Sequence, residues 1–535
     1  MKLLKPVVLL LLIPSLMLGQ SAAPAPAQNF DDTRISQQIK GLQDAIARQQ
    51  EQIQALQQEL AMRKKAESEP RLTNAALTTG AASTTTIVQE TEKAKESPLS
   101  FRIGGTDFTP GGFVDFTNVF RSTNTGSIVS TGFGGIPFSN TPQGHLTEYR
   151  ATGQYSRFNL KVSGKYGANN VTGYIESDFN GNDAANVFVS TNPHTMRLRL
   201  YWLDLKRGQW EFLGGQSWGL LTPNRTGVSP APSDLALTYS QDANIHVGIH
   251  HTRQGTFRAA WHPTDHFAWA FAVENPQQFT NGEVVVPTAF AGQLANQVDG
   301  GATTGVPNAG PDLATKLAWD STPFGRKFHF ELGGMFTTSK VAVLPIGGAT
   351  KFAKHSGIGG GIEGALNFEL VKNFRFITNG LWGPGVGRYL TGLGPQYVVT
   401  PIALSPTSFD TDVSMVHSGG GTAGFEVQAG KNTQIGTYYG GVYFQRNAFP
   451  DVTSPAATKP IIGFGGIGSA TTNNRAIQQG SFEWTQTFWK NPQYGAVLLN
   501  TQVSYLTRAP WFVAPGAPKN AHLTMAYVAL RYVLP

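Results

Sequence analysis

Apolar and polar side chains alternate along many short segments after residue 100, and this period of two constrains the fold more than any other feature. In one segment, Phe158, Leu160 and Val162 alternate with Arg157 and Lys161 among others. Successive side chains of a β-strand point to opposite faces, so the alternation indicates strands with one apolar and one polar face. We recognise about sixteen such segments, give or take about two. The sequence therefore predicts an all-β domain over residues 101–535.

The connections between these segments are of two kinds. Some are short turns, such as residues 167–170. The others are long and rich in Gly, Pro, Ser and Thr, and they lie near residues 122–144, 219–243, 276–310, 390–410 and 447–474. Transmembrane β-barrels show this asymmetry, and they must close because lipid cannot pair an open sheet edge.

The composition fits a surface shared between lipid and water. Charged residues make up 14% of the chain, below the usual quarter, and the mean hydropathy is −0.18. Aromatic residues gather near strand ends, in residues 484–489 and 527–532, as they do in interfacial girdles. A soluble β-sandwich or propeller is the structural alternative. The girdles and the charged polar faces favour a transmembrane antiparallel β-barrel of about sixteen strands.

The alternation also assigns side chains to faces. The side chains predicted to face lipid are Phe158, Leu160, Val162, Leu198, Leu200 and Trp202. The cations predicted to line a path for anions through the lumen are Arg157, Lys161, Arg197, Arg199, Arg225, Arg388 and Arg508. The acids predicted in the same lumen are Glu176, Asp178 and Glu483.

Two interpretations of these lumen cations remain open. Rings of Arg and Lys favour anions in pores, and a guanidinium grips carboxylate or phosphate at two points. Alternatively, the arginines only neutralise the lumen acids. The segment 219–243, which carries Arg225 and several prolines, is expected to fold inward and narrow the passage.

The N-terminal hundred residues differ in composition and period. Residues 1–27 have a charged start, a short apolar core and small residues at 25–27, which predict a cleaved signal peptide. Residues 28–70 are predicted to form a coiled-coil segment, followed by a flexible linker over 71–100. The coiled-coil seam repeats every 3.5 residues through Ile35, Ile39, Leu42, Ile46, Gln49, Ile53, Leu56 and Leu60.

Little in the sequence points to catalysis or cofactors. The close histidines His246, His250 and His251 lie in a segment without helical character, so we predict no metal site. No cysteine is present, no nucleophile motif is found, and the Gly-rich stretches lack the strand-to-helix context of nucleotide sites. The basic residues are scattered, which argues against nucleic acid as a partner. We therefore expect no cofactor and no enzyme activity, with a barrel-embedded hydrolase as a weak alternative.

The order of these parts resembles the DcaP-like porins of bacterial outer membranes, with the phosphate-selective porins as a more distant comparison. The motifs that carry the resemblance include Tyr174-Ile175-Glu176-Ser177-Asp178-Phe179, Arg197-Leu198-Arg199-Leu200-Tyr201, Gly214-Gly215-Gln216-Ser217-Trp218, Ala272-Val273-Glu274-Asn275-Pro276, Pro311-Asp312-Leu313 and Gly387-Arg388-Tyr389-Leu390. The resemblance implies an outer-membrane homotrimer in contact with lipid, a periplasmic coiled coil, and passive uptake of small anionic solutes.

Two further alternatives concern assembly and role. Ile at one seam position and Leu at the other favour parallel coiled coils of two helices, whereas the resemblance implies an assembly of three chains. The second alternative is a structural role, in which the barrel is only an outer-membrane anchor for a periplasmic coiled-coil tether.

Overall fold

The structure, a computed structural model, describes residues 97–181, 194–232, 234–242, 244–299 and 310–535. They belong to one compact unit, which spans Thr79–Pro535. The predicted signal peptide, the coiled-coil seam from Ile35 to Leu60 and most of the predicted linker lie outside the described residues. Within the described residues, no helix is long and apolar enough to cross a membrane.

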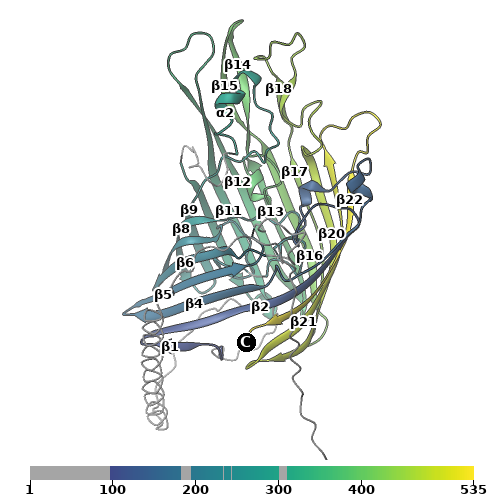
Figure 1. Cartoon of the computed structure of the whole chain (residues 1–535). Helices are drawn as coiled ribbons and strands as arrows, with labels where there is room; N and C mark the ends of the chain where they lie inside the picture. The colour runs from purple at the N-terminus through teal and green to yellow at the C-terminus, as the bar shows by residue number, and fades with distance from the viewer. Residues whose placement is uncertain (1–96, 182–193, 233, 243, 300–309) are drawn as a thin grey trace, which may run out of the picture. The chain divides into compact units, whose positions relative to one another are not determined.

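Strands make up most of the described chain (Figure 1). The first eleven are β1 (Phe101–Ile103), β2 (Thr106–Arg121), β3 (Glu148–Thr152), β4 (Arg157–Tyr166), β5 (Asn169–Asp178), β6 (Arg197–Arg207), β7 (Trp210–Trp218), β8 (Arg253–Thr264), β9 (Phe267–Glu274), β10 (Asp312–Ser321) and β11 (Phe328–Val343). The others are β12 (Ala353–Val371), β13 (Phe374–Pro384), β14 (Tyr397–Ser405), β15 (Ser408–Met415), β16 (His417–Gln428), β17 (Thr433–Phe444), β18 (Asn447–Pro450), β19 (Ile461–Phe464), β20 (Asn474–Asn491), β21 (Gly495–Pro510) and β22 (Ala521–Val533). The helical pieces are η1 (Phe133–Gly135), η2 (Pro142–His145), η3 (Thr288–Phe290), α2 (Ala291–Leu294), η4 (Pro323–Gly325) and η5 (Gly387–Tyr389).

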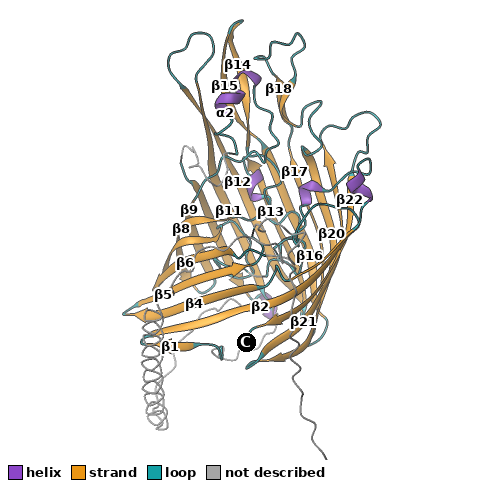
Figure 2. Ribbon diagram, in the orientation of Figure 1, coloured by secondary structure: helices purple, strands orange, loops and turns teal. Residues whose placement is uncertain are grey.

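One antiparallel sheet closes on itself to form a barrel (Figure 2). The closing contact joins the first long strand to the last, because β22 pairs with β2 from Phe113 opposite Val533 to Arg121 opposite Met525. The sheet contains 18 strands, but two of them are short and add no place to the wall. β1 pairs only with the start of β2, and β3 pairs with the end of β2 on the edge where β4 pairs with its start. Sixteen strands therefore complete the wall, which confirms the predicted all-β barrel and its strand number. The hairpins β14–β15 and β18–β19 stand apart from this sheet.

Large apolar side chains cover the outside of the wall, and charged ones line the inside. In β11, Phe330 and Leu332 are exposed on either side of Glu331, which is fully buried. In β22, Leu530 is exposed and its neighbour Arg531 is buried. An apolar exterior with a polar interior is the opposite of a soluble β-protein and is typical of a barrel that crosses a membrane.

The prediction that Leu200 and Trp202 face lipid is wrong. A β-bulge in β6 places Ser177 opposite Leu198 but Glu176 opposite Leu200, so Arg199 is an extra residue in the ladder. Arg199 and Leu200 therefore both lie inside, and the alternation is reversed beyond them. Leu200 is fully buried, and Trp202 packs inside against Tyr174 with ring centroids 5.1 Å apart. Phe158 and Leu198 are exposed on the outer face, as predicted.

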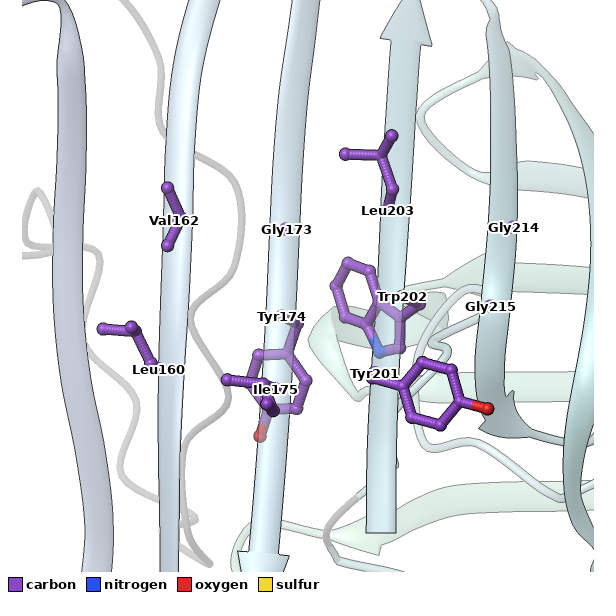
Figure 3. Close-up of a pocket in the computed structure, with 10 residues that line it drawn as sticks. All are labelled: Leu160, Val162, Gly173, Tyr174, Ile175, Tyr201, Trp202, Leu203, Gly214 and Gly215. Atoms are coloured by element: carbon purple, nitrogen blue, oxygen red, sulfur yellow. The ribbon is translucent and has the colours of Figure 1, made fainter. Parts of the chain in front are cut away.

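The bulge also shapes the outer wall between β4 and β7. Tyr201 and Leu203 take the outward places that Leu200 and Trp202 would otherwise hold. They line a shallow apolar groove together with Val162 and Gly214 (Figure 3). A glycine adds no side chain to the wall, so the surface is recessed at Gly214 between its larger neighbours.

Single-cysteine labelling tests this reversal, because the chain has no cysteine of its own. We expect Leu203→Cys to react with a lipid-soluble maleimide confined to the bilayer, and Trp202→Cys not to react. Leu198→Cys, on the near side of the bulge, is the positive control. Reaction of Trp202→Cys with the lipid-soluble reagent would contradict the bulge.

Candidate functional site

A long connection between β7 and β8 folds into the barrel instead of extending from its rim. We call this segment, residues 219–252, the inner loop; residues 233 and 243 within it are not described. Its hydrogen bonds reach strands that are far from β7 and β8 in the sheet: Thr238 Oγ1 donates to Gln502 of β21 at 3.1 Å, and the Val247 backbone amide donates to Gln479 of β20 at 3.1 Å. The predicted inward folding of residues 219–243 is therefore observed.

At Asp242 the inner loop meets a group of arginines on nearby strands of the wall. We call the guanidinium groups of Arg157 (β4), Arg197 and Arg199 (β6) and Arg253 (β8) the arginine cluster. Its carboxylate partners are Glu176 and Asp178 of β5 and Asp242 of the inner loop. The structure thus brings together three predicted pathway cations and two predicted lumen acids.

Asp242 is the centre of this arrangement. Its carboxylate lies 3.7 Å from Arg157, 3.4 Å from Arg197 and 3.3 Å from Arg253, and it accepts a hydrogen bond from Arg199. Burial alone would raise the pKa of Asp242, but the arginines outweigh it and hold that pKa well below its usual range. The carboxylate is therefore ionised at neutral pH.

The strands hold the arginines in place through aromatic rings and acids. Arg253 lies over the ring of Trp218 at 5.1 Å, and Arg157 lies over Phe113 at 5.4 Å. Arg199 donates to Glu176 at 2.7 Å and to Asp178 at 2.8 Å. Even so, two donors of the cluster, Arg157 Nε and Arg199 Nη2, are buried without a hydrogen-bond partner among the described residues.

A second set of buried charges anchors the start of the inner loop. Lys316 Nζ lies 2.9 Å from Glu331 and 3.5 Å from Glu363, and it donates to the Thr222 carbonyl at 2.8 Å. The Asn224 amide donates to Glu331 at 3.1 Å. These contacts join the loop to β10 and β11 independently of Asp242.

A third anchor lies on the far wall. Arg225 of the inner loop pairs with Glu426 of β16 through two hydrogen bonds of 2.5 and 2.6 Å. Tyr438 of β17 donates to the same carboxylate at 2.6 Å. Arg225 is thus a structural partner of Glu426 in this arrangement, and its charge is matched by a carboxylate.

A second segment also enters the barrel. Residues 385–396, which contain η5, follow β13 and carry Arg388 and Tyr389. Both side chains hydrogen-bond Asp312 of β10, at 2.6 and 3.0 Å. The Tyr389 carbonyl accepts a hydrogen bond of 2.8 Å from the His251 amide, which links this segment to the inner loop.

The remaining predicted residues lie apart from these anchors. Lys161 is half-buried on the inner face of β4 and makes no ion pair within the described part of the chain. Arg508 is buried and donates to neutral oxygens, namely the carbonyls of Ile136 and Thr471 at 2.6 Å each and Asn474 Oδ1 at 3.1 Å. Glu483 is buried on the inner face of β20. Predicted pathway residues are therefore spread over the bore.

Sequence reasoning missed Asp242 and Arg253. Asp242 lies in a segment without any period, so no pattern assigns its direction. Arg253 shares parity with Phe257, which is exposed on the outer face, and alternation alone would therefore point it outward. A weaker signal for Asp242 was available in the sequence. The inner loop contains two acids, Asp234 and Asp242, and the arginines predicted to face the lumen outnumber the acids predicted there, so a further acid was needed to pair with them.

The interior of the barrel at this level is closely filled. Wall side chains from several sides, including Glu331, Glu426 and Gln502, are almost inaccessible to solvent where the inner loop meets them. Within the arginine cluster, Arg197 and Arg253 keep 32% and 19% of their side-chain surface exposed, so the cluster has one edge open to water. A small solute that reaches the cluster would therefore meet Arg197 and Arg253 before Arg157 and Arg199.

Comparison with solved structures finds the fold of this barrel in an outer-membrane channel. The outer membrane channel DcaP of Acinetobacter baumannii matches with a TM-score of 0.53 and 14% identity, over 80% of this chain and 98% of that one. An anion-selective porin from Comamonas acidovorans has a TM-score of 0.43 and 11% identity, over 80% of this chain and 100% of that one. The first match confirms, at the level of the fold, the expected resemblance to DcaP-like porins. No protein-family model matches the sequence, and no curated protein matches it either.

The Arg225–Glu426 anchor leads to a prediction about the inner loop. Glu426→Ala leaves the guanidinium of Arg225 buried without its carboxylate, which costs about 3–5 kcal/mol and raises the population of undocked loop by roughly a hundredfold or more. We expect trypsin to cleave after Arg225 much faster than in the native protein, as measured by fragment mass. Glu211→Ala is the matched control, because Glu211 pairs with Arg258 and His262. Equal cleavage in both variants would contradict the anchor.

Proposed function

We propose that this chain forms an outer-membrane channel through which small hydrophilic solutes diffuse, with a preference for anions. The observation that carries the proposal is a closed wall of sixteen strands with an apolar exterior and a charged interior. Such a wall separates a polar bore from lipid, as transmembrane barrels do. The similarity in fold to a protein described as an outer membrane channel supports the same role.

The anion preference is supported by the charges in the bore. The arginine cluster sets four cations against three carboxylates. Lys161 has no ionic partner within the described residues, and Arg508 is bound to neutral oxygens. The surplus of cations at the arginine cluster lies within low-dielectric walls and raises the local concentration of anions there, whether carboxylates or phosphates.

A structural anchor is the second candidate, because the inner loop fills so much of the bore. In that role the barrel would hold a periplasmic coiled coil in the outer membrane and would conduct no ions. The two candidates differ in one measurement, since a channel conducts in a planar bilayer and an anchor does not.

Reversal potentials across a salt gradient test the selectivity. We expect the native protein to prefer anions, and Arg197→Glu to reduce or invert that preference, because it replaces the most exposed cation of the cluster by an acid. Arg207→Glu is the matched control, since Arg207 is exposed and is the last residue of the same strand, beside the short turn to β7. A cation preference in the native channel that Arg197→Glu leaves unchanged would contradict the proposal.

We further propose that the chain assembles as a homotrimer, with residues 28–70 forming a helical bundle on the periplasmic side. The coiled-coil period supports self-association, and barrel contacts can set the number of chains. Native mass measurement in detergent should give three chains per particle. Removal of residues 32–66 should weaken the oligomer and leave the barrel folded. Particles of two chains would overturn this assignment.

A further inference from the structure

Asp242 occupies the arginine cluster as a bound carboxylate ligand would. It alone among the three carboxylates comes from the inner loop, whereas Glu176 and Asp178 belong to β5. Its side chain ends in the same group as acetate, and all four guanidinium groups reach it. The wall of the barrel therefore builds a carboxylate site, and the chain fills that site with one of its own residues.

We propose that the arginine cluster is a binding site for the carboxylate group of a solute, and that such a solute exchanges with Asp242 and releases the part of the inner loop next to it. The inference rests on the proposed channel function and adds to it a ligand class, a site and a means of opening. In the resting protein the Asp242 carboxylate occupies the site and holds the adjoining part of the inner loop against the arginines.

Charge makes the vacated site strongly attractive to an anion. Without Asp242, four arginines face two carboxylates, and Arg199 in particular is almost fully buried. A buried charge left without its partner is costly, so the undocked state is stable only when another anion takes the place of Asp242. An incoming carboxylate supplies two acceptor oxygens for charge-assisted hydrogen bonds.

The cluster has donors to spare for such a ligand. Arg157 Nε and Arg199 Nη2 are buried, and neither has a hydrogen-bond partner among the described residues. Asp242 thus leaves part of the site unused. A free carboxylate can adjust its position to reach donors that a side chain tethered to the loop does not.

The site is accessible, and its internal ligand is replaceable. The exposed edges of Arg197 and Arg253 give a solute a first contact before exchange. Asp242 has a φ of 54°, a left-handed conformation that is unfavourable for a residue with a side chain, and release removes this strain. The other anchors of the inner loop, at Thr222 and Arg225 near its start and at Thr238 and Val247 on either side of Asp242, do not depend on Asp242, so only the residues next to Asp242 need to move.

Tethering sets the concentration range of the exchange. A ligand on a short flexible connection competes at an effective concentration in the millimolar range. Free carboxylates should therefore bind the native protein weakly, and removal of the internal competitor should strengthen their binding. Asp242→Asn makes this change with little difference in shape.

The experiment uses ¹³C-acetate and the full-length protein in detergent at constant ionic strength. Line broadening gives the dissociation constant, and we expect acetate to bind D242N at least about tenfold more tightly than the native protein. Acetamide, the neutral analogue, should bind neither. Asp234→Asn is the matched control, because Asp234 is the other acid of the inner loop and lies outside the arginine cluster. Equal affinity in D242N and the native protein would overturn the proposal.

A second readout follows the loop itself. Asn244→Cys places a thiol in the buried stretch beside Asp242, and a water-soluble maleimide should label it faster in acetate than in acetamide. An unchanged labelling rate would remove the release step.

If D242N does not form a barrel, Arg253→Gln replaces it. We then expect acetate to bind about tenfold more weakly than to the native protein, because one charge-assisted contact is lost. Unchanged affinity in Arg253→Gln then overturns the site.

The outcomes also separate this inference from the proposed function. A protein that conducts ions but binds acetate equally with and without Asp242 keeps the channel and loses the exchange. A protein that binds acetate as predicted but never conducts keeps the carboxylate site and loses the channel.

Discussion

Backbone pairing between β2 and β22 is the contact on which the rest of the structure depends. A strand edge in hydrocarbon leaves N–H and C=O groups without water or partners, which costs several kcal/mol for each group. Pairing from Phe113 to Arg121 removes the two edges that a sheet of this size would otherwise present. Once the wall is closed, its inner face is separated from lipid, and charged side chains can point inward on every side.

The interior is organised by matching charges across the bore. Each acid that fixes the inner loop belongs to a different part of the sheet or to the loop itself, as Asp242, Glu331 and Glu426 show. Buried ion pairs contribute little net stability compared with apolar packing, but breaking one partner is strongly unfavourable. Such contacts therefore specify where the loop lies more than they stabilise the barrel.

Local periodicity predicted the barrel and the inward direction of Arg197 and Arg508, because the side-chain period of a strand is a property of neighbouring residues. It failed at Leu200, since a single extra residue, Arg199, reverses the face and leaves no mark in the composition. It could not predict the pairing of Arg225 with Glu426, which are 201 residues apart, because that contact exists only after the sheet has closed. The role of Asp242 has the same origin, as a segment without period obtains its direction from the walls around it.

The same long-range contacts impose an order on how the molecule is built. The inner loop precedes β16, β20 and β21 in the chain, yet it forms hydrogen bonds with all three, and Tyr239 and Gln502 are separated by 263 positions. Contacts between distant parts of a chain form late, because the intervening segments must first be ordered. The loop therefore stays hydrated while the wall assembles, and its charges enter the bore only when the final strands are in place. A barrel that assembles in this order passes through a stage in which the inner loop does not yet fill its bore.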